Sequence, residues 1–187
     1  MTVDGNSVLS CYGGATYGPC TDYASSATNA EGDTFTQCAG HGSPYHYHTA
    51  PTCLLQQMGP RSDGASPQVG WAADGFPIYG NRGPGGVLIK ACGETGADAT
   101  YCADSCGGYY GTDYADDFKY RYFLMGAEND FTTSPLSNLP GPEYFPFSPL
   151  CLLGCGATSI ASTSGDRNPR IGDLLPACTG ASIASAA

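Results

Sequence analysis

Positively charged residues are scarce in this sequence: Lys and Arg number only 7 among 187 residues, against 17 Asp and Glu. Phosphate contacts need clustered Lys and Arg, so the net charge of −10 argues against a nucleic-acid-binding protein. An apolar run of about 18 residues, which a transmembrane helix needs, is also missing, so we expect no membrane span. Charged residues make up 13%, roughly half the usual share, so Ser, Thr, Gly and Tyr must cover much of the surface.

Several catalytic and modification motifs are absent as well. The sequence contains no GxSxG nucleophile elbow, no P-loop and no GxGxxG loop that follows a strand. No Asn-x-Ser/Thr sequon occurs, so N-linked glycans are not expected, whereas exposed Ser and Thr leave O-linked glycans open. Asp113, Asp116 and Asp117 lack the regular spacing of an EF-hand, and solvated acids are favoured there over a calcium site.

Cysteine, by contrast, is abundant. Ten cysteines in a short, turn-rich chain predict up to five disulfides but leave their connectivity open. A zinc–thiolate site is disfavoured because no CxxC pair occurs, and we therefore expect an extracellular or periplasmic protein. Residues 1–5 lack the basic and apolar regions of a signal peptide, so the numbering is expected to start on a mature chain or a fragment. The disulfide candidates are Cys11, Cys20, Cys38, Cys53, Cys92, Cys102, Cys106, Cys151, Cys155 and Cys178.

Dense turn signals separate short apolar segments along the chain. This pattern predicts an all-β fold, a disulfide-stabilised sandwich or barrel-like domain with long loops and little helix. We expect a single domain over residues 1–187, with a surface loop at 156–170 and one helical turn near Ile171–Leu175. The expected strands are Ser7–Tyr12, Thr34–Cys38, Tyr45–Thr49, Gln68–Ala73, Phe76–Tyr79, Val87–Ala91, Phe118–Met125 and Tyr144–Leu152.

The clearest local unit is a hairpin over residues 70–80. Asp74–Gly75 suits a two-residue type I′ turn, in which both central residues have positive φ. Pro77 cannot donate a hydrogen bond to a neighbouring strand, so its arm is expected at an edge or a bulge. Trp71, the single tryptophan, is expected in the core. Asp74 either forms the turn, which we favour, or faces a site.

All three histidines lie within eight residues, at His41, His46 and His48. In a strand, His46 and His48 point to the same face with Cα atoms roughly 6–7 Å apart, close enough for both imidazoles to bind one metal ion. His41 could supply a third nitrogen, and a disulfide between Cys38 and Cys53 would hold the loop. Copper or zinc is the expected ion. The alternative is structural packing with hydrogen-bonded imidazoles.

Several segments together resemble the YHYH domain family. They are YHYH at 45–48, PTCL at 51–54, GWAADGFPIYG at 70–80, CAGH at 38–41, FPF at 145–147 and GC at 154–155. The resemblance covers about residues 5–156. The family occurs in secreted and periplasmic bacterial proteins and in eukaryotes, and its biochemical role is uncharacterised. The resemblance therefore implies a fold rather than a reaction.

One departure from the family pattern concerns a second YHYH-like segment. The best match here is residues 118–122, where Lys119 and Arg121 stand in place of the two histidines. A four-histidine metal centre is therefore not expected, because two cations beside a metal ion would repel it. The two cations are expected to pair with Asp113, Asp116 and Asp117 or with aromatic rings. A site of His41, His46 and His48, with Asp74 as a possible addition, remains.

Three functions fit these features. The favoured one is a non-catalytic extracellular module that assembles into a homo-oligomer or filament through its termini and sheet edges, with the histidine site as a subsidiary feature. The second is a monomeric secreted protein that binds copper or zinc. The third is a metal-dependent redox or hydrolytic enzyme, which would need an open coordination position and a pocket.

Overall fold

The computed structural model describes residues 22–72, 74–111, 118–127 and 141–150, together with the backbone of residues 2–3 and 6–8. The strands are β1 (Thr2–Val3), β2 (Asn6–Val8), β3 (Gly40–His41), β4 (His46–Tyr47), β5 (Gln68–Trp71), β6 (Pro77–Tyr79), β7 (Gly108–Tyr110) and β8 (Tyr120–Phe123). The α-helices are α1 (Ala27–Glu31) and α2 (Thr52–Met58). The 3-10 helices are η1 (Tyr23–Ser25), η2 (Gly32–Thr34), η3 (Pro84–Gly86) and η5 (Pro142–Tyr144).

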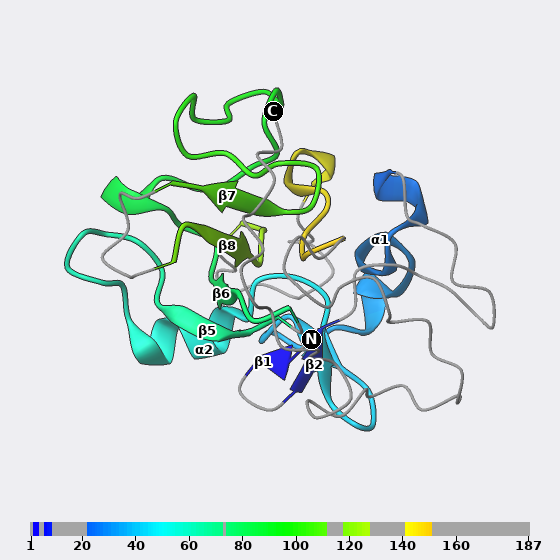
Figure 1. Cartoon of the computed structure of the whole chain (residues 1–187). Helices are drawn as coiled ribbons and strands as arrows, with labels where there is room; N and C mark the ends of the chain where they lie inside the picture. Colours follow the sequence, from blue (N-terminus) through cyan, green and yellow to red (C-terminus); the bar gives the residue numbers. More distant parts are fainter. Residues whose placement is uncertain are drawn as a thin grey trace.

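The described strands form one mixed sheet in the order β3-β4-β2-β1-β5-β6-β8-β7. The pairs β2–β4 and β6–β8 are parallel, and the other pairs are antiparallel. Figure 1 shows β5, β6, β8 and β7 as neighbouring strands, with α1 and α2 on opposite sides of the view. The fold is therefore rich in sheet and poor in helix, as expected, while sandwich or barrel closure stays a prediction.

The centre of the sheet is buried on both faces. All four residues of β8 are buried, and successive side chains along a strand point to opposite faces. Tyr120 and Tyr122 accordingly pack with Ile78 in one core cluster, whereas Phe123 packs with Tyr79 in another. Tyr47 from β4 joins the first cluster, so the strand that carries His46 is anchored to the central core.

Several expected strands are not strands. Thr34–Cys38 contains the end of η2 and a turn in which the Ala39 amide bonds to the Thr36 carbonyl, 3.0 Å away. Val87–Ala91 forms only isolated bridges, Leu88 with Arg82 and Ala91 with Ala103. The described part of Tyr144–Leu152 is irregular because Pro146 offers no amide hydrogen and Phe147 has a positive φ of 61°. Conversely, β7 and both helices were not expected.

Trp71 is not a core residue: it is 49% exposed and packs edge-on against Phe118. It ends β5, where the buried side chain is Val69 instead. Pro77 does not lie on an edge strand, because its strand β6 lies in the interior of the sheet between β5 and β8. The proline is tolerated there as the first residue of the strand, and the register shift lies in β5, between Gln68 and Gly70.

The hairpin turn differs from a two-residue type I′ turn. The Gly75 amide bonds to the Ala72 carbonyl at 3.0 Å, and the Ala72 amide bonds to the Phe76 carbonyl at 2.8 Å. Gly75 has a φ of +89°. This pattern is typical of a three-residue loop that closes with a glycine bulge. The side chain of Asp74 supports the turn by accepting a hydrogen bond from the Phe76 amide.

Disulfides join Cys38 to Cys53 and Cys92 to Cys102, and Cys106 is also disulfide-bonded. The first of these is the pairing expected around the histidine segment. The remaining cysteines and several other expectations lie outside the described residues: Cys11, Cys20, Cys151, Cys155, Cys178, the acids at 113, 116 and 117, the loop at 156–170 and the helical turn at Ile171–Leu175.

Candidate metal centre

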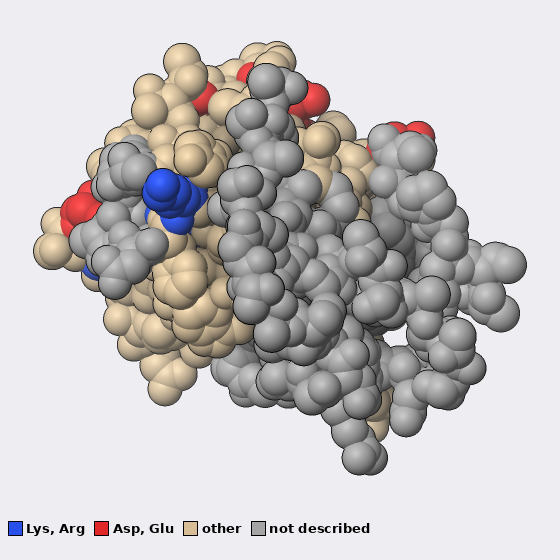
Figure 2. Space-filling view, viewed as in Figure 1, with Lys and Arg blue, Asp and Glu red and all other residues tan. Residues whose placement is uncertain are grey.

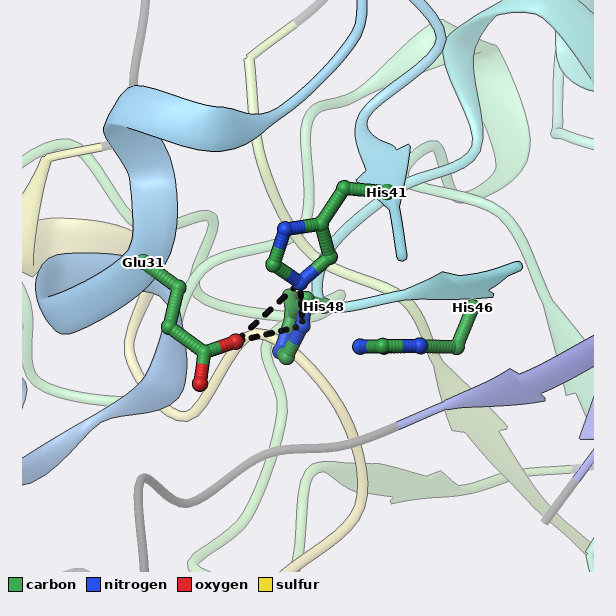
Figure 3. Close-up of side chains that lie close together, drawn as sticks. All are labelled: Glu31, His41, His46 and His48. Carbon is green, nitrogen blue, oxygen red and sulfur yellow. Dashed lines mark hydrogen bonds and ion pairs between the residues drawn. The ribbon is translucent and has the colours of Figure 1, made fainter. Parts of the chain in front are cut away.

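One carboxylate and three imidazoles converge at one place in the structure. The residues are Glu31, His41, His46 and His48, and one potential ligand atom from each lies within 4.8 Å of the others. The Nε2 atoms of His41 and His48 are 2.9 Å apart. Oε2 of Glu31 lies 3.1 Å from the first of these atoms and 3.2 Å from the second. In Figure 3 the outer nitrogen of His46 points toward the same space.

Local structure explains how the histidines meet. His41 and His46 are directly opposed residues of the antiparallel pair β3–β4, so their side chains emerge from the same face. His48 follows His46 by two residues and returns to that face, whereas Tyr45 and Tyr47 pack edge-on against each other on the core side. The three ring centroids accordingly lie 4.7–4.9 Å apart.

Glu31 reaches the cluster from a different element. It is the last residue of α1. The helix begins after Ser26, and the side chain of Ser26 caps it by accepting a hydrogen bond from the Asn29 amide. The helix is held against the histidine segment by Thr28, whose hydroxyl donates to the His48 carbonyl at 3.2 Å. The short helix therefore delivers the carboxylate to the open side of the imidazole pair, as Figure 3 shows.

The loop between β3 and β4 needs glycine at position 42. Gly42 has a φ of +84°, and a Cβ atom at this position would lie 2.8 Å from Cε1 of His46. Any other residue would be strained in its backbone and would displace the imidazole. Glycine at this position thus permits both the turn and the placement of His46.

Hydrogen bonds at the far nitrogens orient two of the three rings. The Thr34 hydroxyl donates its single proton to the Glu31 carbonyl at 2.7 Å, so toward Nδ1 of His41 it can only accept. Nδ1 of His46 lies 3.0 Å from the Pro44 carbonyl, which also can only accept. Both rings must therefore carry hydrogen on Nδ1, and in the neutral state their Nε2 lone pairs are directed into the cluster.

The inner part of the cluster is shielded from water. His48 is fully buried and stacks on Phe35, with ring centroids 4.9 Å apart and an interplanar angle of 10°. Phe35 also contacts His41 edge-on. Glu31 and His41 are partly exposed, at 31% and 15% of their side chains. An ion can therefore enter from the solvent side while an aromatic wall closes the other.

The geometry and the donor atoms suit a divalent cation. Metal–ligand distances of about 2.0–2.1 Å in a tetrahedral zinc site separate neighbouring ligand atoms by about 3.3 Å. The triangle formed by the two Nε2 atoms and Oε2, with edges of 2.9, 3.1 and 3.2 Å, is close to one face of such a tetrahedron. Imidazole nitrogens suit zinc and copper(II), and zinc sites also accept carboxylate oxygen.

The structure brings His41, His46 and His48 together, as expected from their spacing, but it does not bring Asp74 to them. Oδ2 of Asp74 instead accepts a hydrogen bond of 2.6 Å from the Tyr122 hydroxyl. The carboxylate of the cluster is Glu31, which sequence reasoning missed. Nothing in the sequence separates Glu31 from the other sixteen acids, because it lies on a short helix ten residues before the nearest histidine.

Lys119 and Arg121 do not belong to the cluster. Arg121 is fully buried, and its guanidinium donates to the carbonyls of Gly111 and Phe118. Lys119 is exposed. Neither cation therefore occupies a position among the four potential ligands. Their expected pairing with the acids at 113, 116 and 117 concerns residues outside the described part of the chain.

The remainder of the described surface carries few charges, as Figure 2 shows for one face. No helix among the described residues is long and apolar enough to cross a bilayer.

No curated protein and no solved structure matches the chain. The family model for YHYH proteins matches residues 5–130, about two thirds of the chain, including the histidine segment and the 70–80 hairpin. The chain therefore belongs to the YHYH protein family.

Proposed function

We propose that this protein is a secreted, non-catalytic module that binds one divalent metal ion through Glu31, His41, His46 and His48. The observation that carries the proposal is the convergence of imidazole nitrogens and one carboxylate oxygen, with the Nδ1 atoms of His41 and His46 held by oxygen acceptors. Metal-binding histidines commonly show this arrangement, in which the second ring nitrogen donates to an oxygen. The disulfides fit an oxidising compartment outside the cytosol.

Zinc is the ion that we favour. Four protein ligands fill the tetrahedral coordination of a structural zinc site and leave no open position for a substrate. Copper(II) is the alternative, because imidazole sites of this kind bind it at least as strongly in the general order of divalent affinities. Because the ligands come from both α1 and the β3–β4 segment, a bound ion would join two parts of the fold.

Titration of the metal-free protein with zinc in a calorimeter tests the proposal. We expect one site per chain, release of protons on binding and a higher unfolding temperature in the presence of zinc. The double variant His46→Ala/His48→Ala should lose this binding. Glu31→Gln should weaken it, whereas Asp33→Asn, which removes a nearby exposed carboxylate outside the cluster, should not.

Two results would contradict the proposal. One is metal-free protein whose stability is unchanged by zinc and by copper(II). The other is stoichiometric binding that persists unaltered in the double histidine variant, which would place the ion elsewhere. The same titration with copper(II), monitored by its visible absorption, distinguishes the two ions.

Assembly into a filament stays a prediction. The terminal segments expected to mediate it lie outside the described residues, apart from the backbone of β1 and β2. Electron microscopy and light scattering of the purified protein test this expectation, and a monodisperse monomer would count against it.

A further inference from the structure

The Cys38–Cys53 disulfide encloses all three histidines of the cluster. It links residues separated by 15 positions, and His41, His46 and His48 lie between them. Three of the four candidate ligands are therefore carried by one covalently closed loop. Closing a loop reduces the number of conformations that its residues can adopt, so the imidazoles start closer to their binding arrangement.

Hydrogen bonds connect the disulfide to the ligand-bearing strands. Thr36 is central to them: its side-chain oxygen accepts from the Cys38 amide at 3.3 Å and lies 2.8 Å from the Tyr45 hydroxyl. The Thr36 hydroxyl donates to the Gly40 carbonyl at 2.8 Å. On the other side of the disulfide, Thr52 donates to the Gln37 carbonyl at 3.1 Å. Both ends of the closed loop are thus tied together where β3 begins and where α2 begins.

We propose that the Cys38–Cys53 disulfide and the metal ion stabilise each other: the intact disulfide raises the affinity for the ion, and the bound ion makes this disulfide harder to reduce. The proposal rests on the metal site described above. Thermodynamic linkage requires the two effects to be equal. The factor by which the intact disulfide raises the binding constant for zinc is therefore the factor by which saturating zinc lowers the equilibrium constant for reduction of the disulfide. The site would then hold its metal outside the cell and release it in a reducing environment.

The chemical step is ordinary thiol–disulfide exchange with glutathione. A glutathione thiolate attacks one sulfur of the pair and forms a mixed disulfide, and a second glutathione thiolate attacks the glutathione sulfur of that mixed disulfide. The bond between the sulfurs of Cys38 and Cys53 breaks, the sulfur–sulfur bond of oxidised glutathione forms, and two electrons and two protons pass to the two cysteine sulfurs.

The Cys92–Cys102 disulfide is a matched internal control. It closes a loop with a sequence separation of 10 that contains none of the four candidate ligands. Cys92 is exposed and Cys102 partly exposed, and both cysteines of the 38–53 pair are partly exposed, so solvent reaches both disulfides. A general stabilisation of the fold by zinc would affect both pairs, whereas the proposed linkage affects one.

The experiment equilibrates the full chain in glutathione redox buffers, with and without free zinc held constant by a chelator. Differential alkylation followed by peptide mass spectrometry then reports the reduced fraction of each cysteine. We expect zinc to lower the equilibrium constant for reduction of the Cys38–Cys53 disulfide by a factor on the order of ten, which shifts its reduction midpoint by about 30 mV toward more reducing conditions. The reduction midpoint of the Cys92–Cys102 disulfide should stay unchanged.

Serine variants test the reciprocal effect without free thiols. Cys38→Ser/Cys53→Ser should lower zinc affinity by the same factor of about ten, and Cys92→Ser/Cys102→Ser should not. If the first variant fails to fold, the glutathione measurement on the natural chain still decides the question. Equal shifts of both disulfides, no shift despite zinc binding, or easier reduction of the 38–53 pair with zinc would each overturn the linkage and leave the metal site standing. Failure of zinc to bind the oxidised chain would overturn the metal site itself.

Discussion

Replacing Thr34 by Val is expected to weaken zinc binding while leaving all four candidate ligands in place. The Thr34 hydroxyl accepts from Nδ1 of His41 and donates to the Glu31 carbonyl at 2.7 Å. Valine has nearly the same shape, but it offers neither an acceptor nor a donor. Without the acceptor, the His41 ring is free to rotate and to place hydrogen on Nε2, where the metal would bind.

The size of the effect follows from the exposure of this contact. Loss of a hydrogen-bonding partner behind a metal ligand typically lowers metal affinity about 10- to 100-fold. Thr34 is exposed, so a water molecule can take over part of the acceptor role. We therefore expect the lower end of that range, about tenfold, which corresponds to about 1.4 kcal/mol of binding free energy.

Competition with a chromophoric zinc chelator measures this affinity. Thr34→Ser is the matched control, because serine keeps the hydroxyl that makes both hydrogen bonds, and its affinity should stay near that of the natural chain. Denaturant unfolding of the metal-free variants separates an effect on the site from an effect on the fold. Equal affinity in the valine variant and the natural chain, or equal weakening by valine and serine, would refute the orienting role of this hydroxyl.

Two further predictions concern the loop and the core. Gly42→Ala should weaken zinc binding because its Cβ would displace the ring of His46. Gly93→Ala, at a similarly positive φ of +91° and with no atom within 4 Å of the added Cβ, should strain only its own turn. Calorimetric titration of both variants with zinc checks this. Burial and then the Asp104 carboxylate raise the pKa of Tyr120 above its ordinary value, so this phenol stays neutral in the folded chain. The free energy of unfolding should then fall as the pH rises above about 10, because the unfolded chain releases this proton and the folded chain does not. In Tyr120→Phe, the free energy of unfolding should decrease less steeply with pH, as measured by denaturant titrations between about pH 9 and 11. An unchanged slope in the phenylalanine variant would contradict this assignment.

The strands that the sequence predicts correctly are those whose signal is local. Short apolar segments bounded by turn residues identify β5, β6 and β8, because each strand of this kind carries its own apolar residues between two turns. β7 has no such signal: Gly108–Tyr110 is a strand because it pairs with β8. Thr34–Cys38 shows the opposite error, since apparent strand residues form a turn stabilised by Thr36.

Exposure was less predictable than pairing. Trp71 has the size of a core residue, yet it ends β5 at the surface beside Phe118. The helices α1 and α2 have only 5 and 7 residues, too few to show a helical period in the sequence. Helices this short depend on tertiary contacts, such as the bond from Thr28 to the His48 carbonyl, for much of their stability.

The sequence by itself determined the three histidines of the candidate site and the two cysteines that bracket them, because these residues lie within one short segment whose geometry is set by strand alternation and chain connectivity. Only the tertiary structure decided the fourth group. Glu31 joins the cluster through the packing of α1 against the histidine segment, and Asp74, the carboxylate that the sequence suggested, bonds to Tyr122, 48 positions away along the chain. Contacts of this kind depend on how separate elements pack in space, which the spacing of residues along a chain does not encode.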